Sequence, residues 1–246
     1  MTRVAVLGAL GRMGSLSAAA IEADAELELI SRIDIGDDLN ALLDQGIDVA
    51  LDFTAPEAAL GNIEWAVANG INLVVGTSGF DQSKIDKVTA LVADKDVSVI
   101  IVPNFSIGAV LMMKFAQIAA PYFESTEIIE MHHPDKVDAP SGTAIRSAQL
   151  IAQARERAGL GAVPDATATD PAGARGGKVA GIPVHAIRAR GYVASQEVLF
   201  GGLGETLAIR HDSNDRVSFM PGVIAAIKAA PNLQGVHVGL EAILGI

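Results

Sequence analysis

The chain has 246 residues, of which half are hydrophobic, and its 18 basic and 29 acidic side chains give a net charge of -11. This composition indicates a globular protein of one large or two modest domains. It disfavours a disordered chain, and it disfavours nucleic-acid binding because an acidic surface repels phosphates. There is no cysteine, no apolar run that could span a membrane and no signal peptide, so we expect a cytoplasmic protein without disulfides.

A glycine loop follows the first predicted strand. The run Arg3–Leu7 predicts a buried parallel strand, and a helical stretch from Ser15 to about Ala23 follows. Between them, the loop contains Gly8, Ala9, Leu10, Gly11, Arg12 and Met13. Strand, glycine loop and helix in this order suit a dinucleotide pyrophosphate at the helix N-terminus. The glycines fall as GxxGxxG rather than GxGxxG, and a tight turn without a ligand remains the alternative.

The second predicted strand, Leu27–Ile33, ends in Asp34. This is the acidic residue that a nucleotide site places about twenty residues after the loop to accept the ribose hydroxyls. An aspartate there favours NAD over NADP because it would repel a ribose phosphate, and Arg12 and Arg32 would soften that preference. An ordinary carboxylate at a strand end is the simpler explanation.

Strands and helices then continue to alternate. The predicted elements are strand Asp48–Phe53, helix Pro56–Asn69, strand Ile71–Val75, helix Gln82–Ala93 and strand Val97–Val102. The last two strands end in short segments with small or polar residues. These segments are Gly76-Thr77-Ser78-Gly79 and Pro103-Asn104-Phe105. Open α/β sheets bind ligands at the carboxyl ends of their strands, so the recurrence favours a cofactor site over simple turn chemistry.

The second half of the chain changes character after Phe105. The pattern predicts a helix from Ser106 to about Tyr122, strand Glu127–Met131 and a loop over Leu160–Gly177. An antiparallel meander is predicted next, with strands Pro183–Arg190, Tyr192–Phe200 and Thr206–His211. A final helix, Pro221–Ala230, and a strand after it are expected to return to the first domain.

The stretch Glu130–Arg146, EMHHPDKVDAPSGTAIR, carries the candidate chemistry. Two imidazoles, His132 and His133, stand close to the ammonium of Lys136. Ser141 is a good N-cap, and Gly142 and Thr143 fall in the first turn of a helix that Gly159 closes. A helix N-terminus is a ready anion site, so this combination suits a small carboxylate substrate that must be held and protonated. Surface histidines, a solvated lysine and a helix without a ligand are the alternative. No metal is indicated, since no set of ligands has suitable spacing.

Six motifs together resemble the 4-hydroxy-tetrahydrodipicolinate reductase (dihydrodipicolinate reductase) family. They are GALGRMG, DFTAPE, VVGTSGF, PNFSIGA, EMHHPDKVDAPSGTA and HDSNDRVSFMPG, collinear from about Val4 to the C-terminus. The resemblance implies an α/β fold with a Rossmann-like parallel sheet domain, residues 1–105 plus 216–246. It also implies a smaller α+β domain with a mixed sheet for substrate and oligomerisation, residues 106–215, and a homotetramer.

The resemblance also implies an activity and roles for the candidate residues. The activity is reduction of 4-hydroxy-tetrahydrodipicolinate, a cyclic dicarboxylate, by NADH or NADPH in lysine biosynthesis by the diaminopimelate route. Gly8–Met13 would hold the pyrophosphate and Asp34 the ribose, with Gly76–Ser78 and Val102–Phe105 beside the nicotinamide. His132 and Lys136 would be the catalytic pair. The substrate carboxylates would be bound by His133, Ser141, Gly142 and Thr143.

Two other functions remain to be weighed at this point. A different Rossmann dehydrogenase, acting on an amino-acid semialdehyde, would explain the first domain but not the paired histidines before the SGT helix start. A redox-sensing module that reports the NADH ratio would need a binding element for DNA or a partner, and the acidic chain has no basic one.

Overall fold

The structure, a computed structural model, describes residues 1–77 and 79–246, so Ser78, a predicted cofactor residue, lies outside the described part. The chain divides into two compact units. The first unit contains Met1–Ile107 and Phe219–Ile246, and the second contains Gly108–Ser218. None of the helices in the described part combines the length and the apolar character needed to cross a membrane.

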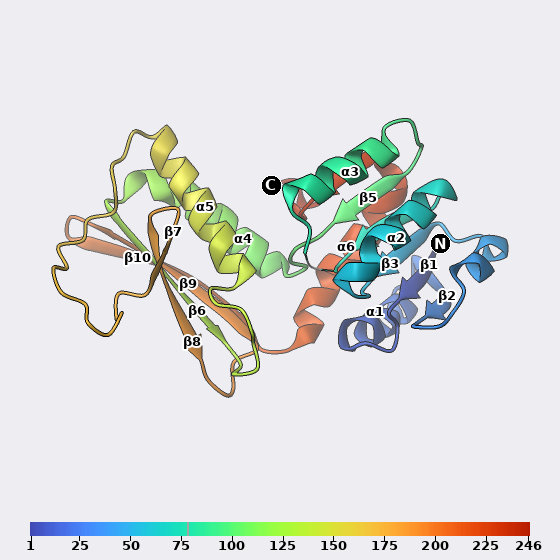
Figure 1. The fold of residues 1–246 in the computed structure, drawn as a ribbon, viewed down its shortest axis with the longest axis horizontal. Coiled ribbons are helices and arrows are strands. Elements are labelled where there is room, and N and C mark those ends of the chain that lie inside the picture. Colours follow the sequence, from blue (N-terminus) through green and yellow to red (C-terminus); the bar gives the residue numbers. More distant parts are fainter. Residues whose placement is uncertain (78) are drawn as a thin grey trace. The chain divides into compact units, whose positions relative to one another are not determined.

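Within the described residues, the first unit contains a six-stranded parallel sheet (Figure 1). Its strands are β1 (Thr2–Leu7), β2 (Leu27–Ile33), β3 (Val49–Asp52), β4 (Asn72–Val75), β5 (Ser98–Ile101) and β11 (Gly235–Val238). The spatial order is β11-β5-β4-β3-β1-β2. The predicted parallel sheet is confirmed, and β11 pairs with β5 from far along the sequence.

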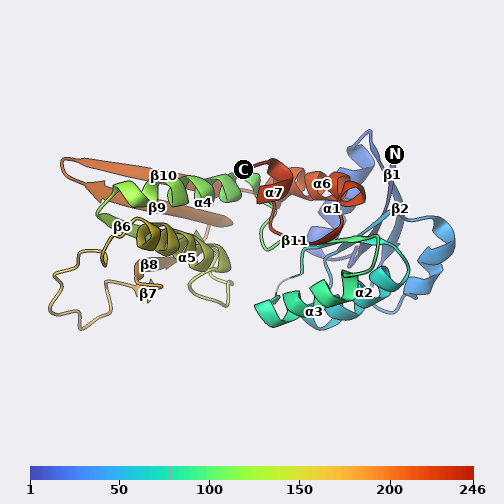
Figure 2. The same cartoon turned by 90° about the horizontal axis from the view of Figure 1, so that it is seen from above.

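Helices cover both faces of this sheet, with α2 and α3 on one side and α1 and α6 on the other (Figure 2). The helices and short 3-10 segments of this unit are α1 (Arg12–Ala23), η1 (Leu39–Gln45), α2 (Pro56–Ala68), α3 (Gln82–Val92), α6 (Met220–Ala229), η4 (Ala230–Asn232) and α7 (Glu241–Leu244). The boundary between the two units falls within η3 (Arg216–Phe219). Helix α1 begins at Arg12, three residues before the predicted start, so the glycine loop is shorter than expected.

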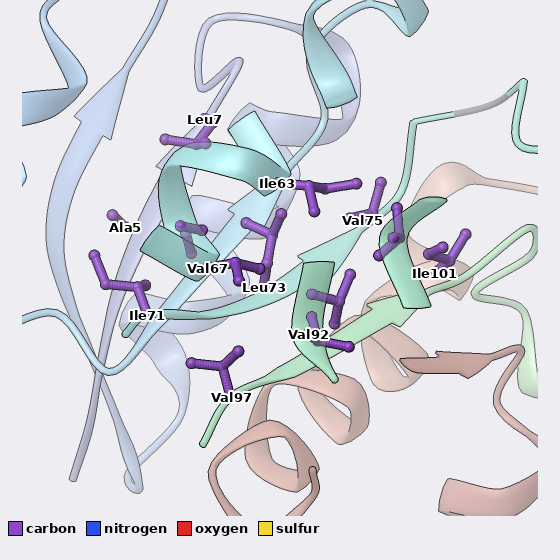
Figure 3. Close-up of a cluster of buried hydrophobic side chains, with 14 of the residues drawn as sticks. Ala5, Leu7, Ile63, Val67, Ile71, Leu73, Val75, Val92, Val97 and Ile101 are labelled. Atoms are coloured by element: carbon purple, nitrogen blue, oxygen red, sulfur yellow. The ribbon is translucent and has the colours of Figure 1, made fainter. Parts of the chain in front are cut away.

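The core of the first unit lies between the sheet and helices α2 and α3. β-Branched and small side chains dominate it, because the strands of a parallel sheet are covered on both faces. Ile63 and Val67 of α2 meet Leu73, Val75 and Ile101 of the strands, all nearly or fully buried (Figure 3).

The strand order reverses direction at β1, which lies between β2 and β3. The chain passes from β1 to β2 on one side. The later strands β3, β4, β5 and β11 then follow one another on the other side of β1. Such a reversal leaves a crevice outside the carboxyl ends of the strands, where open α/β sheets bind ligands. The glycine loop follows β1 at this point.

Within the described residues, the second unit contains a five-stranded mixed sheet (Figure 1). Its strands are β6 (Ser125–His132), β7 (Gly177–Val179), β8 (Ile182–Arg188), β9 (Ala194–Gly202) and β10 (Glu205–Ser213). Their order is β10-β9-β6-β8-β7. Helices α4 (Ile107–Ala119) and α5 (Gly142–Arg157), with the short η2 (Ala120–Tyr122), complete the unit.

The predicted antiparallel meander is wrong in one respect. β9 and β10 form the expected hairpin, but β8 does not pair with β9. Instead β6 lies between them, parallel to β8 and antiparallel to β9. Strand patterns identify strands but not their partners, and β8 lies between β7 and β6 because it pairs with a strand more than 50 residues earlier. β7 was not predicted: its first residue, Gly177, ends the predicted loop, and its other two residues lie between that loop and the predicted strand Pro183–Arg190.

One face of the mixed sheet packs against α4 and α5. Ile128, Val198 and Phe200 point to this face and are almost fully buried. On the opposite face, Ile187 and Leu199 remain 42% and 37% exposed. We call this second surface the open face.

Candidate functional site

The glycine loop is folded back on the end of β2. The amides of Gly8 and Ala9 donate to the carbonyl of Ile33 at 2.8 and 3.0 Å, and Gly11 N–H donates to the Gly8 carbonyl at 3.1 Å. Gly8 has a φ of 77°, and a Cβ on Gly14 would lie 2.0 Å from the Gly8 oxygen. Only glycines therefore allow this turn. The N-cap of α1, Gly11, has no side chain that could occupy the helix start.

Asp34 lies directly against this loop. Its Oδ2 accepts a hydrogen bond from the Leu10 amide at 2.7 Å, and its Oδ1 accepts one from the Ile35 amide at 2.9 Å. These two amides, Leu10 first, hold the pKa of Asp34 below its usual value. The carboxylate is thus charged at neutral pH and fixed beside the turn, as ribose recognition requires.

A buried carboxylate, Asp52, organises the neighbouring strand ends. It is fully buried at the end of β3, and its Oδ1 accepts from Thr54 Oγ1 at 2.7 Å and Thr77 Oγ1 at 3.0 Å. Its Oδ2 accepts from the Asn62 side-chain amide at 2.8 Å. The network connects β3, the middle of α2 and the segment after β4, and so positions the predicted cofactor residue Thr77.

The residues after β4 and β5 also lie at the carboxyl edge of the sheet. Phe105 is 5% exposed and packs on Phe53, with ring centroids 5.4 Å apart. A Cβ on Gly76 would collide with both rings, so Gly76 permits their contact. Val102 is buried, Pro103 is exposed, and Asn104 accepts from the Ser106 amide at 2.8 Å through Oδ1. The side chain of Phe105 therefore belongs to the core.

The predicted catalytic stretch of the second unit is organised by Glu130, which the sequence analysis left unassigned. Glu130 is fully buried at the end of β6. His132 Nδ1 lies 2.6 Å from its Oε2, and Arg188 of β8 donates to Oε2 and Oε1, both at 2.8 Å. The backbone amide of Ser141 donates to Oε1 at 3.1 Å. One carboxylate thus joins the imidazole, a guanidinium and the start of α5.

The charge of Glu130 follows from these contacts. Burial raises the pKa of a carboxyl group, but hydrogen bonds and charges from His132 and Arg188 outweigh burial and lower the pKa of Glu130 to about 2. Glu130 is therefore a carboxylate throughout the physiological pH range. The side chain of His132 is 13% exposed, so the ring is largely enclosed while a small part remains accessible.

The other predicted side chains lie in the turn that follows. Lys136 Nζ forms an ion pair with Asp138 at 2.7 Å. The backbone amide of Lys136 donates to the His133 carbonyl at 3.2 Å. His133 Nδ1 is 4.0 Å from Asp135 Oδ2 and 35% of its side chain is exposed. Arg188 also donates to the Asp138 carbonyl at 2.8 Å, which fixes the turn against β8.

The predicted N-cap at Ser141 is confirmed. Ser141 Oγ accepts from the Ala144 amide at 3.2 Å, and α5 begins at Gly142. Gly142 is exposed, and a Cβ there would meet no atom within 4 Å. The fold alone does not require a glycine at this position. Thr143 is half-buried, and its carbonyl accepts from Ser147 Oγ.

The predicted residues therefore form two groups, one in each unit. Those of the first unit gather at the carboxyl edge of the parallel sheet, and those of the second gather where β6 meets α5. Three functional candidates were missed, namely Asp52, Glu130 and Arg188. Glu130 could have been found because it shares a strand face with His132, two residues on. Arg188 carries no such signal, because it depends on the pairing of β8 with β6.

This fold and these side chains define the class of protein, a Rossmann-type α/β oxidoreductase with a second, mixed-sheet unit. Two family models match the chain. The model described as dihydrodipicolinate reductase, N-terminus, matches residues 2–105, and the one described as dihydrodipicolinate reductase, C-terminus, matches residues 108–244. The chain therefore belongs to the dihydrodipicolinate reductase family, as the sequence motifs indicated.

Individual relatives agree with this assignment. The 4-hydroxy-tetrahydrodipicolinate reductases of Mycolicibacterium smegmatis and Streptomyces coelicolor are 54% and 53% identical over 245 residues. These matches cover 99% of this chain and 99% and 98% of the relatives. A solved structure of dipicolinate-bound dihydrodipicolinate reductase from Paenisporosarcina sp. TG-14 is 36% identical, with a TM-score of 0.88 and 99% of both chains covered.

The activity follows from this family membership. The protein is an oxidoreductase of lysine and diaminopimelate biosynthesis that reduces 4-hydroxy-tetrahydrodipicolinate to tetrahydrodipicolinate with loss of water. A reductase of this family implies a nicotinamide cofactor and a small dicarboxylate substrate.

Proposed function

We propose that the first unit binds NADH or NADPH and that the second unit binds the cyclic dicarboxylate and supplies the proton for its reduction. For the cofactor, the support lies in Gly8–Met13 at the reversal of strand order, with Asp34 hydrogen-bonded to that loop. The crevice would also include Gly76, Thr77 and Asn104. When bound, the reduced nicotinamide supplies the hydride.

Asp34 favours NADH over NADPH. Its pKa is lowered, so it carries a negative charge that would oppose the 2′-phosphate of NADPH. Arg32, which could offset this charge, forms an ion pair with Glu22 at 2.8 Å. Both cofactors are accepted in this proposal, and NADH is the better one.

The substrate carboxylates are held at the start of α5. The exposed backbone of Gly142 and the first turn at Thr143 provide the positive end of the helix dipole. His133 and Lys136 add donors on the preceding turn. The relative from Paenisporosarcina binds dipicolinate, a planar cyclic dicarboxylate, which has the shape and charge that this arrangement suits.

His132 and Lys136 are the proton-transfer groups. Hydride addition to the unsaturated ring leaves a carbanion or enamine, and a proton must be delivered to it. An imidazole can serve as acid or base near neutral pH, and a lysine ammonium can serve as an acid. Lys136 is held by Asp138, so the ammonium must exchange this partner for the substrate when it acts.

The observation that carries the proposal is the link from His132 through Glu130 to the Ser141 amide, which places an imidazole beside a helix start.

Lys136→Ala tests the division of roles between the two units. We expect turnover to fall by about 100-fold or more, while the Kd for NADH changes less than about twofold. Lys178→Ala, which removes an exposed ammonium paired with Asp165, is the control and should leave turnover near that of the wild type. Loss of NADH binding in Lys136→Ala would contradict the proposal.

We further propose that the protein is a homotetramer assembled through the open face of the mixed sheet. Ile187 and Leu199 give this face an apolar centre that a second copy could cover. Leu199→Glu should reduce the mass measured by light scattering. Leu203→Glu, at the fully exposed turn between β9 and β10, is the matched control and should leave the mass unchanged. A tetramer that persists in Leu199→Glu would place the interface elsewhere.

A further inference from the structure

Glu130 occupies the centre of the second unit's site without being placed to touch a substrate. It is fully buried, and both of its oxygens accept hydrogen bonds from His132, Arg188 and the Ser141 amide. A buried carboxylate costs free energy unless it is paired. Here the pairing is complete, and it joins three elements that the site depends on: β6, β8 and α5.

These contacts determine the tautomer of His132. A carboxylate can only accept hydrogen bonds, and Oε2 of Glu130 lies 2.6 Å from Nδ1, so Nδ1 must carry the proton of that bond. Nε2 is then the nitrogen left for exchange of a proton. A carboxylate behind an imidazole also stabilises the imidazolium form, as in other sites where a buried acid orients a histidine.

We propose that Glu130 is a positioning residue for the reduction, which holds His132 with Nδ1 protonated and leaves Nε2 to transfer the proton, while Arg188 keeps the carboxylate in place. This inference rests on the proposed role of His132 in proton transfer. Through the Ser141 amide, the same carboxylate fixes the distance between the imidazole and the helix start that binds the substrate.

The chain contains a second cluster with the same composition, which serves as an internal comparison. Glu127 lies on the opposite face of β6, since it is three positions before Glu130 and successive side chains of a strand alternate between the two faces. It binds His185 Nε2 at 2.6 Å and also pairs with Arg175. If a carboxylate between a histidine and an arginine only stabilised the sheet, both clusters would respond alike to substitution.

The first experiment compares Glu130→Gln with Glu127→Gln. Glu130→Gln should lower kcat by roughly 10- to 1,000-fold with little change in KM, since the ring loses its orientation and charge partner. The alkaline limb of the kcat/KM profile should move to lower pH, because a neutral amide does not stabilise the imidazolium. His185 and Arg175 face Glu127, whereas His132 and Arg188, with Lys136 and Asp138 beyond them, face Glu130. Glu127→Gln should therefore leave kcat and the pH profile unchanged. Equal effects of both variants would overturn the inference.

The second experiment reads the imidazole directly by NMR of the ring nitrogens. In the wild type, His132 should be observed as the Nδ1-protonated form, and in Glu130→Gln as a mixture of tautomers, because an amide can both donate and accept. An unchanged tautomer in Glu130→Gln would overturn the inference. This measurement needs no activity, so it remains decisive even if His132 proves not to transfer the proton.

A double-mutant cycle with His132→Ala separates the two proposals. If Glu130 acts through His132, Glu130→Gln should lower kcat no further in the His132→Ala background. Full additivity would overturn the positioning role. A His132→Ala variant with normal kcat would instead contradict the proposed role of His132. Should Glu130→Gln fold poorly, Glu130→Gln combined with Arg188→Met removes both charges, and it should show the same mixture of tautomers.

Discussion

The Leu10 amide donates a hydrogen bond of 2.7 Å to Asp34 Oδ2, which ties the exposed tip of the glycine loop to the acidic residue that follows β2. The contact joins residues 24 apart in the sequence and fixes the charge of Asp34 beside the place proposed for the adenosine ribose. It therefore bears on both the shape of the loop and the choice of cofactor.

Asp34→Asn should shift the cofactor preference toward NADPH. The amide still accepts from Leu10 but no longer repels a 2′-phosphate, so the ratio of kcat/KM for NADPH over NADH should rise by about tenfold, or about 1.4 kcal/mol. Steady-state kinetics with both cofactors measures the ratio. Asp44→Asn, on the exposed η1, makes the same change in net charge and should leave the ratio unchanged. An unaltered preference in Asp34→Asn would remove Asp34 from ribose recognition.

The unfolding free energy should depend on pH through Glu130. Its pKa is about 2 in the folded protein against an ordinary value of 4.5, so its stabilising contribution is fully present above pH 4.5 and is lost as the pH falls toward 2. The shift corresponds to about 3 kcal/mol. Denaturant unfolding at a series of pH values gives the free energy of unfolding of the wild type and of Glu130→Gln. The difference between these two free energies should narrow as the pH falls from 5 to 2. A difference that stays constant over this range would show that folding does not lower the pKa of Glu130.

Asp52→Asn should weaken both the fold and cofactor binding. One of the two buried oxygens becomes an NH₂ group, which faces either the Thr54 backbone amide or the Asn62 side-chain NH₂. Both of these are hydrogen-bond donors, and the mismatch costs about 1–3 kcal/mol. Thermal unfolding and the Kd for NADH should both report the loss. Asp48→Asn is the control at the other end of β3, where the exposed carboxylate accepts from the Arg3 amide. If Asp52→Asn binds NADH as the wild type does, the network is only structural.

Gly142→Ala should separate folding from substrate binding. No atom lies within 4 Å of the added Cβ, and alanine favours a helix over glycine, so the melting temperature should stay equal or rise slightly. The methyl group would instead occupy the space beside the helix start where a carboxylate must approach, so KM for the substrate should rise by about tenfold. Gly222→Ala is the contrasting variant, since its Cβ would lie 2.0 Å from the Phe105 carbonyl and should destabilise the fold.

The sequence was most informative where local patterns determine structure. Parallel strands such as β3 and β5 are buried on both faces, so their apolar runs predicted each of these strands to within one residue at either end. Ser141 correctly predicted the start of α5, because an N-cap depends on a local hydrogen bond between residues close in the sequence.

The pairing of strands that are far apart in the sequence could not be predicted. The position of β6 between β8 and β9 depends on contacts across 50 or more residues, and no turn or periodicity encodes it. Arg188 could not be associated with Glu130 for the same reason. Asp52 was not predicted, because the sequence of a strand that ends in aspartate does not show whether the carboxylate is buried or exposed.

The place of β11 at the edge of the parallel sheet has a consequence for biosynthesis of the protein. β5 borders β4 on one side and β11 on the other, and β11 emerges from the ribosome more than 130 residues after β5. Until then the nascent chain carries β5 as an uncovered edge, the kind of surface that invites wrong partners. The inserted unit, by contrast, is one continuous segment and can complete its own sheet earlier.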